Sequence, residues 1–144
     1  MLTQLVIGSI TIIVSMAVLV GILVAAMNLT RRIDVFFANH YLARYQIFVT
    51  ISSAVILVLA ANTVCVWIWA MLLYLLGIFS NLEEAVYFSI SSFTTVGYGD
   101  LVVGRDWRVL SGFVSVNGLL AFGIFTAFLV EIFRELYAKF LPRK

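Results

Sequence analysis

Charged side chains are scarce in this sequence. Only 11% of its 144 residues are Asp, Glu, Lys or Arg, whereas 64% are hydrophobic. An ordinary soluble domain carries about 25% charged residues, because its surface must stay in water. The composition therefore excludes a typical soluble domain and indicates a protein that lives in a membrane.

Cysteine, histidine and proline each occur once, as Cys65, His40 and Pro142. A lone cysteine cannot form an intrachain disulfide, and Cys65 lies in an apolar run, where it behaves as a small hydrophobe. His40 could titrate as a pH sensor, although a lone surface histidine is more often a bystander. With no metal-ligand cluster, carboxylate pair or activated nucleophile in the sequence, we expect neither an enzyme nor a cofactor.

Three long apolar segments, residues 4–27, 46–79 and 107–133, dominate the chain. About 20 apolar residues in a helix cross a hydrocarbon core of roughly 30 Å, so each segment is long enough to span a membrane. The first could instead be a cleaved signal peptide ending near Ala25-Ala26. It lacks a positive start and exceeds the usual length of such peptides, so we expect a retained helix.

Basic residues gather between the first two segments and after the third. Residues 29–45 contain Arg31, Arg32 and Arg44 against one acid, and residues 134–144 are also rich in Lys and Arg. Basic loops stay in the cytoplasm, which predicts an outside N-terminus and a cytoplasmic C-terminus in the plasma (inner) membrane. Apolar residues recur at helical spacing in the connector, which is therefore either a short interfacial helix or a simple solvated link.

A short amphipathic piece, residues 81–93, follows the second segment. Ser80 and Glu83 have the spacing of a capping box, which predicts Ser80 as the helix N-cap. Glu83 and Glu84 then lie in the first turn, where the helix dipole favours acids. The opposite end would present partial negative charge to a cation, although an ordinary re-entrant helix would have the same cap.

The stretch Thr94-Thr95-Val96-Gly97-Tyr98-Gly99-Asp100 has no helical or strand pattern. Irregular backbone at membrane depth is tolerated only where protein or a water-filled passage satisfies it. Gly97 and Gly99 let alternate residues adopt backbone angles that a Cβ disfavours, so that successive carbonyl groups face the same way. Such oxygens can replace the water shell of a cation; the alternative is a glycine-rich extracellular turn.

This stretch resembles the selectivity filter of tetrameric potassium channels, whose TVGYG core is matched at residues 95–99. Residues 46–133 resemble the two-helix pore module of bacterial potassium channels and inward rectifiers, and the first helix lies outside that likeness. The resemblance implies a homotetramer in the lipid bilayer that conducts K+ and binds no nucleic acid. It implies K+ binding by oxygens of Thr95, Val96, Gly97 and Tyr98. It also implies filter support by Thr94, Gly99, Asp100, Tyr87 and Ser91.

Two departures from the family pattern concern the support of the filter. Ser91 stands where several bacterial relatives hold a glutamate, and Tyr87-Phe88 stands where relatives have paired tryptophans. Tyr87 can donate a hydrogen bond to Asp100, whereas Phe88 cannot donate one. We therefore expect a filter that is held less rigidly from behind.

The third segment contains three glycines, Gly112, Gly118 and Gly123. Small residues let membrane helices approach closely, which explains all three. The resemblance adds a bending role for Gly118 and implies a cavity or gate at Gly118, Phe122 and Thr126. A 3.6-residue period places Ser115, Leu119, Phe122 and Thr126 on one stripe, with Asn117 near its edge.

The sequence thus predicts an all-α membrane protein with three transmembrane helices, a re-entrant pore helix and an extended filter, assembled as a tetramer. Its parts are an additional helix (1–28), a basic connector (29–45), the pore module (46–133) and a cytoplasmic tail (134–144). We expect the additional helix on the perimeter and the function to be potassium-selective conduction. The alternatives are a weakly selective cation channel and a non-conducting membrane sensor or accessory subunit.

Overall fold

The computed structural model describes residues 1–38 and 45–140, and these form helices joined by loops, with no strand among them. The elements in chain order are α1 (Leu2–Ala38), α2 (Gln46–Leu75), α3 (Leu82–Phe93), the 3-10 turn η2 (Arg105–Trp107) and α4 (Arg108–Phe140). The predicted all-helical fold class is confirmed.

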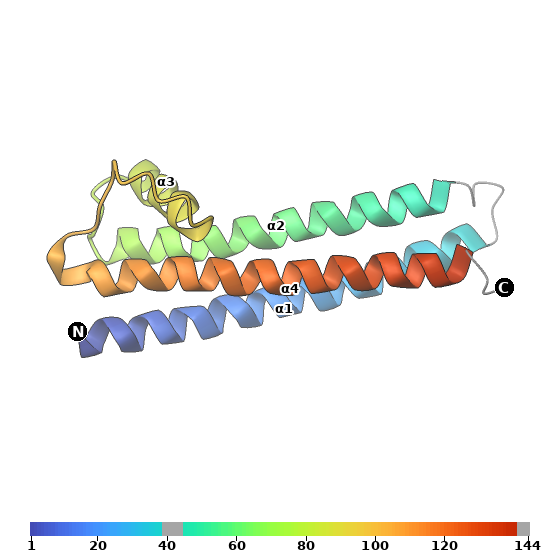
Figure 1. Ribbon diagram of the computed structural model, residues 1–144, viewed down its shortest axis with the longest axis horizontal. Helices are drawn as coiled ribbons and strands as arrows, with labels where there is room; N and C mark the ends of the chain where they lie inside the picture. Colours follow the sequence, from blue (N-terminus) through green and yellow to red (C-terminus); the bar gives the residue numbers. More distant parts are fainter. Residues whose placement is uncertain (39–44, 141–144) are drawn as a thin grey trace.

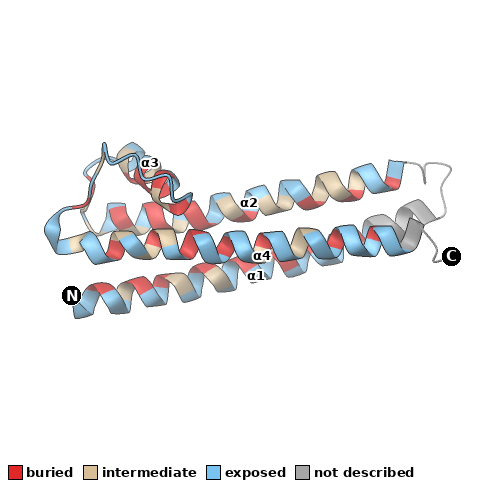
Figure 2. Ribbon diagram, viewed as in Figure 1, coloured by how far each residue is buried: buried red, intermediate tan, exposed pale blue. Residues whose placement is uncertain are grey.

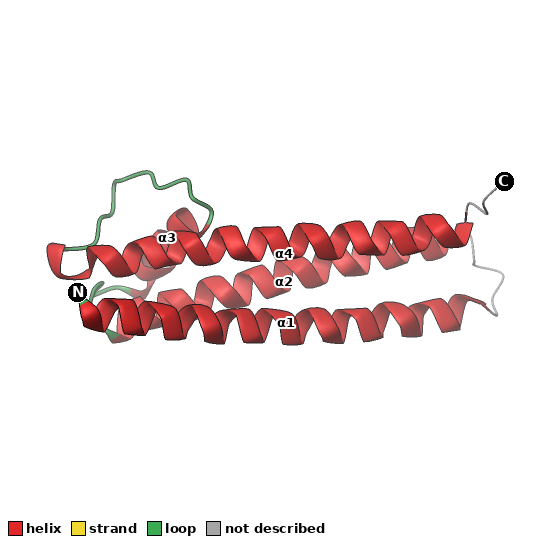
Figure 3. Cartoon of the chain, turned by 60° about the horizontal axis from the view of Figure 1, so that its bottom comes forward, coloured by secondary structure: helices red, strands yellow, loops and turns green. Residues whose placement is uncertain are grey.

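The long helices α1, α2 and α4 lie side by side along the molecule, and α3 packs on α2 and α4 near one end (Figures 1 and 3). α1 and α4 run in the same direction, and α2, which lies between them in the sequence, runs antiparallel to both (Figure 1). Three stretches are long and apolar enough to cross a membrane: Leu2–Thr30, Gln46–Leu75 and Arg105–Ala138.

α2 ends at Leu75, four residues before the end expected from hydropathy. Gly77 stops it by adopting a φ of +67°, a left-handed conformation that suits glycine. The backbone N–H of Gly77 donates to the Tyr74 carbonyl (3.0 Å), and that of Ile78 donates to the Leu73 carbonyl (3.1 Å). This pair of bonds is a Schellman motif, which ends the helix although apolar residues continue beyond it.

Two helices extend beyond the boundaries expected from the apolar runs. α1 continues past residue 28 to Ala38, and α4 continues past residue 133 to Phe140. Neither a glycine nor a proline lies between residue 28 and Ala38, so nothing in the sequence breaks the helix when the apolar run ends. The predicted connector therefore begins as a continuation of α1, and the remainder of it that includes His40 lies outside the described residues.

The predicted N-cap of α3 is wrong by one residue. Asn81, in an extended conformation (φ −119°, ψ 133°), is the N-cap, and its carbonyl accepts the Ala85 N–H at 3.2 Å. With Asn81 in that place Ser80 and Glu83 are out of register for a capping box, and no side-chain cap bond forms. Glu83 and Glu84 lie in the first turn as expected.

The hydrophobic core is concentrated where α3 packs against α2 and α4, and much of the remaining helical surface is exposed (Figure 2). Trp69, Leu73, Leu110 and Val114 are fully buried there. Leu19 and Leu23 of α1 belong to the same cluster, so α1 is part of the core. Apolar side chains along the outward faces suit contact with lipid tails or with further copies of the chain.

Candidate functional site

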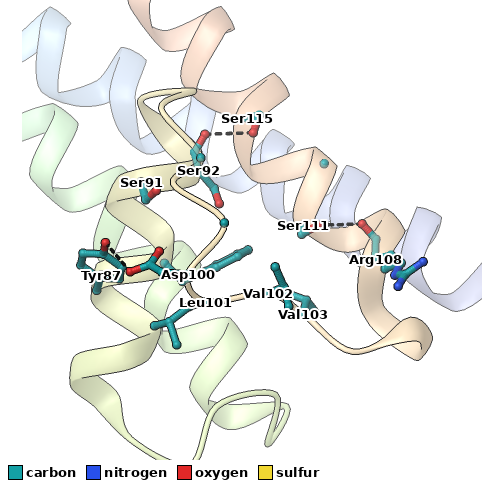
Figure 4. A pocket seen from close by; sticks show the side chains of 14 residues that line it. Tyr87, Ser91, Ser92, Asp100, Leu101, Val102, Val103, Arg108, Ser111 and Ser115 are labelled. Carbon is teal, nitrogen blue, oxygen red and sulfur yellow. Dashed lines mark hydrogen bonds between the residues drawn. The ribbon is translucent and has the colours of Figure 1, made fainter.

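The stretch from Thr94 to Asp100 leaves the end of α3 and returns along it as an irregular segment without β structure, called the strand below (Figure 4). Thr94 is the C-cap of α3. Its backbone N–H donates to the Ile90 carbonyl at 3.0 Å, and its hydroxyl donates to the same carbonyl at 2.8 Å. Thr94 therefore closes the helix and fixes the point from which the strand starts.

The backbone of this strand alternates in handedness. Thr95, Gly97 and Gly99 have φ values of +62°, +53° and +79°, whereas the intervening Val96 and Tyr98 are not in the positive-φ region. The left-handed angles of both glycines were anticipated, but that of Thr95 was not. Left-handed backbone costs a residue with a Cβ roughly 1–2 kcal/mol, and a β-branched side chain such as that of Thr95 favours an extended conformation instead.

Ser91 of α3 holds the middle of the strand from behind. Its carbonyl accepts the N–H of Gly97 at 3.0 Å, and its hydroxyl accepts the N–H of Tyr98 at 3.3 Å. In a planar trans peptide the carbonyl of one residue points opposite to the N–H of the next. The carbonyl oxygens of Val96 and Gly97 therefore point away from α3, towards the exposed side of the strand.

Tyr87 and Asp100 form the hydrogen bond that the sequence predicted. The Tyr87 hydroxyl donates to the Asp100 carboxylate at 2.8 Å, which ties the outer end of the strand to α3 (Figure 4). The bond to Tyr87 lowers the pKa of Asp100, and the same bond raises the pKa of Tyr87. The contact therefore favours a charged carboxylate and a neutral phenol.

These two shifts define the pH range over which the Tyr87–Asp100 bond is kept. Its stabilisation is fully present above the ordinary Asp pKa of 3.8 and is lost as the pH falls through the lowered pKa. At the alkaline end it persists until the pH rises through the raised pKa of Tyr87, above 10.0. The bond should thus be unaffected by pH at neutral and mildly acidic pH.

Replacement of Tyr87 by Phe should move the acid limit of this bond. Without the hydroxyl, the pKa of Asp100 returns upward towards 3.8. If the protein conducts ions as its resemblance to potassium channels implies, we expect acid-induced changes in ion flux through Tyr87→Phe to begin at a higher pH than in the wild type. Liposome flux recorded against the pH on the strand side measures this, and identical acid profiles for the two proteins would contradict a role of the bond in holding the Asp100 end of the strand.

The base of the strand is fixed by the Ser92 carbonyl. This oxygen accepts the N–H of Thr95 at 3.0 Å and the hydroxyl of Ser115, on α4, at 2.9 Å (Figure 4). Gly118, one turn further along α4, is buried, and any Cβ there would overlap the Phe93 carbonyl. The start of the strand and the end of α3 are thus seated directly on α4.

A cavity of about 480 Å³ lies between the strand and the N-terminal part of α4 (Figure 4). Ser91 and Ser92 line it on the α3 side, and Ser111, Gly112 and Ser115 line it on the α4 side. On the strand itself the side chains of Val96 and Tyr98 remain 54% and 72% exposed. One chain alone therefore leaves the strand largely uncovered.

Phe122 and Thr126 lie beyond the point where α3 covers α4. Phe122 is 71% exposed and Leu119 is 61% exposed, and the Thr126 hydroxyl bonds only to the Phe122 carbonyl of its own helix. They share an uncovered face, as the predicted stripe requires. The prediction that Asn117 lies near the edge of this stripe is wrong, because Asn117 is fully buried against α1.

Close packing, offered as the reason for all three α4 glycines, holds for Gly118 alone. A Cβ added to Gly112 or Gly123 would meet nothing within 4 Å in the described chain.

Within the described ranges, no group of His, Cys, Asp or Glu is placed to hold a metal ion. The polar groups of the strand are its backbone N–H and carbonyl groups, the hydroxyls of Thr94, Thr95 and Tyr98, and the Asp100 carboxylate.

Three candidate membrane-crossing helices, with a short helix and the irregular strand inserted between the last two, indicate an integral membrane protein. The family described as ion channel matches residues 47–135, and the chain belongs to this family. The match covers α3, the whole strand and most of α2 and α4, and it leaves α1 outside. Comparisons with curated proteins and with solved structures gave no match.

Proposed function

We propose that this ion channel is a potassium-selective homotetramer that conducts K+ passively through the strand at residues 95–98. The observation that carries the proposal is the alternating backbone of Thr95, Gly97 and Gly99, with its N–H groups turned towards Ser91 and Ser92. A strand of this form offers its carbonyl oxygens on one side. Carbonyl oxygens gathered around an axis replace the hydration shell of K+.

Each residue of the strand has a part in this proposal. Val96 and Gly97 supply carbonyl oxygens whose direction follows from the bonds to Ser91, and Thr95 and Tyr98 supply the oxygens below and above them. The Thr95 hydroxyl adds a further oxygen at the inner end. Gly99 and Asp100 shape the outer end, and Thr94, Tyr87 and Ser91 hold the strand in place.

The tetramer follows from geometry. One strand presents oxygens to one side of an ion only, and closed symmetric repetition supplies the remaining sides. The exposure of Val96 and Tyr98 in the single chain supports this assembly, since neighbouring copies would cover them. Phe122 and Thr126, on the uncovered face of α4, would then line the cavity or gate on the inner side.

Charge placement supports an outside N-terminus and a cytoplasmic C-terminus in a plasma membrane. Arg32 lies in the C-terminal part of α1, and Arg134 lies in the C-terminal part of α4. Both of these helix ends are at the far end of the molecule from the strand (Figure 1). Basic residues favour the cytoplasmic side. The strand would then open to the outside, where Trp107 lies in the interfacial layer.

Reversal potentials of the reconstituted protein in mixed potassium and sodium test the proposal. We expect a reversal potential close to the equilibrium potential of potassium. A reversal potential between the equilibrium potentials of potassium and sodium would identify a weakly selective cation channel. Absence of any current from correctly assembled protein would favour a sensor or accessory subunit instead.

External block by tetraethylammonium gives a second, independent measurement. In relatives that are blocked tightly, an aromatic residue stands two positions beyond the filter aspartate, and Val102 occupies that place here with 74% of its surface exposed. We expect weak block of the wild type. Val102→Tyr should be blocked more tightly, because four aromatic faces can bind the cation. Tight block of the unmodified protein would show that the role of this position in the resembled channels does not transfer to Val102.

A further inference from the structure

α1, which lies outside the matched ion channel region, is fastened to the outer half of α4 by side-chain contacts. The Gln4 side chain accepts the free N–H groups of Val109 and Leu110 at 3.1 and 3.2 Å, and it donates to the Asp106 carbonyl. Gln4 thereby satisfies backbone donors at the start of α4 that have no partner within their own helix. α1 thus supplies an N-terminal cap for the helix on which the strand is seated.

The same pairing continues deeper along the two helices. Gly8 lies so close to Phe113 that a Cβ would overlap its ring. Further along, the Asn117 amide donates to the Ser15 hydroxyl at 2.9 Å, and both residues are fully buried. The Asn117 carbonyl oxygen has no partner among the described residues, so Ser15 supplies the only hydrogen bond that the structure gives this amide.

The Ser15–Asn117 pair lies on the same turn of α4 that holds the base of the strand. Ser115 donates to the Ser92 carbonyl on one side of this turn, and Asn117 bonds to α1 on the other. Residues two positions apart point to nearly opposite sides of a helix. Since the Ser92 carbonyl also accepts the Thr95 N–H, an unbroken series of contacts joins Ser15 to the first residue of the strand.

We propose that α1 positions the inner end of the strand through Ser15 and Asn117, so that α1 is a regulatory element of the conducting site. A displacement of α1 at Ser15 moves the turn of α4 that carries Ser115 and Gly118, and these two residues set the place of Ser92 and Phe93. Ser15 and Asn117 are positioning residues and touch no ion. The conduction arm of the test rests on the proposed function, whereas the exchange arm does not.

Hydrogen exchange of the full-length protein in lipid nanodiscs tests the coupling directly. Ser15→Ala and Asn117→Ala should each speed amide exchange in residues 92–98 by about threefold to tenfold, the range that one interhelical hydrogen bond in a membrane supports. The double variant should exchange no faster than the single ones, because both remove the same bond. Ser15→Thr keeps the hydroxyl and should restore the wild-type rate.

Thr11→Ala is the matched control. Thr11 lies on the same helix, and its hydroxyl bonds only to the Ile7 carbonyl of α1 at 2.8 Å. This variant should leave exchange in residues 92–98 unchanged. Ser115→Ala, which removes the next contact in the series, should speed exchange at least as much as Asn117→Ala.

Flux measurements separate this inference from the proposed function. If the wild type conducts potassium, the two alanine variants should differ from it in open probability or in the potassium-to-sodium permeability ratio, with unchanged single-channel conductance.

Variants that lower only the melting temperature, with exchange in residues 92–98 unaltered, would overturn the positioning role. A wild type that conducts nothing would refute the proposed function, yet the exchange result would still decide whether α1 positions the strand. Ser15→Ala removes a single oxygen, so it provides the test even if Asn117→Ala does not assemble.

Discussion

Gly99→Ala is expected to abolish potassium flux while leaving the amount of assembled protein largely intact. Gly99 has a φ of +79°, and a Cβ added there meets nothing within 4 Å. The effect must therefore come from the backbone. Left-handed backbone costs alanine roughly 1–2 kcal/mol, which amounts to about 4–8 kcal/mol over the four copies of the proposed tetramer. No neighbouring atom would hold the strained form, so the peptide should rotate and turn its carbonyl away from the axis.

Gly77→Ala is the matched control for this variant. Gly77 has a similar φ of +67° and equally open surroundings, but it ends α2 and is remote from the strand in sequence. It should lose similar stability per chain and keep its potassium flux. Liposome flux and thermal unfolding of both variants measure the two effects separately. Normal flux through Gly99→Ala would refute the carbonyl arrangement.

Gly118→Ala is expected to lower potassium flux by more than about tenfold and to reduce potassium selectivity. The added methyl group would overlap the Phe93 carbonyl, which is backbone and cannot rotate away as a side chain would. Overpacking of this kind costs about 1–3 kcal/mol or more, and about 1.4 kcal/mol already corresponds to a factor of ten. The end of α3 must shift, and with it the Ser92 carbonyl that holds Thr95.

This experiment also distinguishes close packing from a bending role of Gly118. A hinge that is made stiffer should change how often the channel opens but leave the selectivity of the residual flux intact. A displaced strand should lose selectivity as well. Gly112→Ala, on the same helix but with nothing within 4 Å of the added Cβ, is the control and should resemble the wild type. Unchanged selectivity in Gly118→Ala would contradict the close-packing explanation.

The sequence predicted those features of the fold and the site that depend on local composition. Hydropathy located all three candidate spans, and the spacing of the glycines predicted the left-handed angles at Gly97 and Gly99. The bond from Tyr87 to Asp100 was predicted from the resemblance to the potassium channel filter, together with the ability of a tyrosine hydroxyl to donate. Helix ends were predicted less well, because the Gly77 turn and the continuation of α1 to Ala38 are set by backbone hydrogen bonding.

Other features of the site could not be predicted, since they depend on contacts between distant residues. Gln4 reaches backbone groups 105 and 106 residues away, and the Asn117–Ser15 bond spans 102 residues. A single polar residue in an apolar helix indicates that a partner is needed without indicating which helix provides it. The left-handed Thr95 could not be predicted for a different reason, because its conformation contradicts the preference of its own β-branched side chain.

The parallel pairing of α1 with α4 has a consequence for how the protein is made. The first helix enters the bilayer early in synthesis, but its buried Ser15 finds Asn117 only after about a hundred more residues have been added. The Ser92 carbonyl at the base of the strand likewise gains its bond from Ser115 only later, because the strand is synthesised before the helix that supports it. Docking of α4 is therefore the step that completes the subunit, and contacts of such long sequence separation form slowly. Until then Gln4 and Ser15 lack the partners on α4 that they have in the folded subunit.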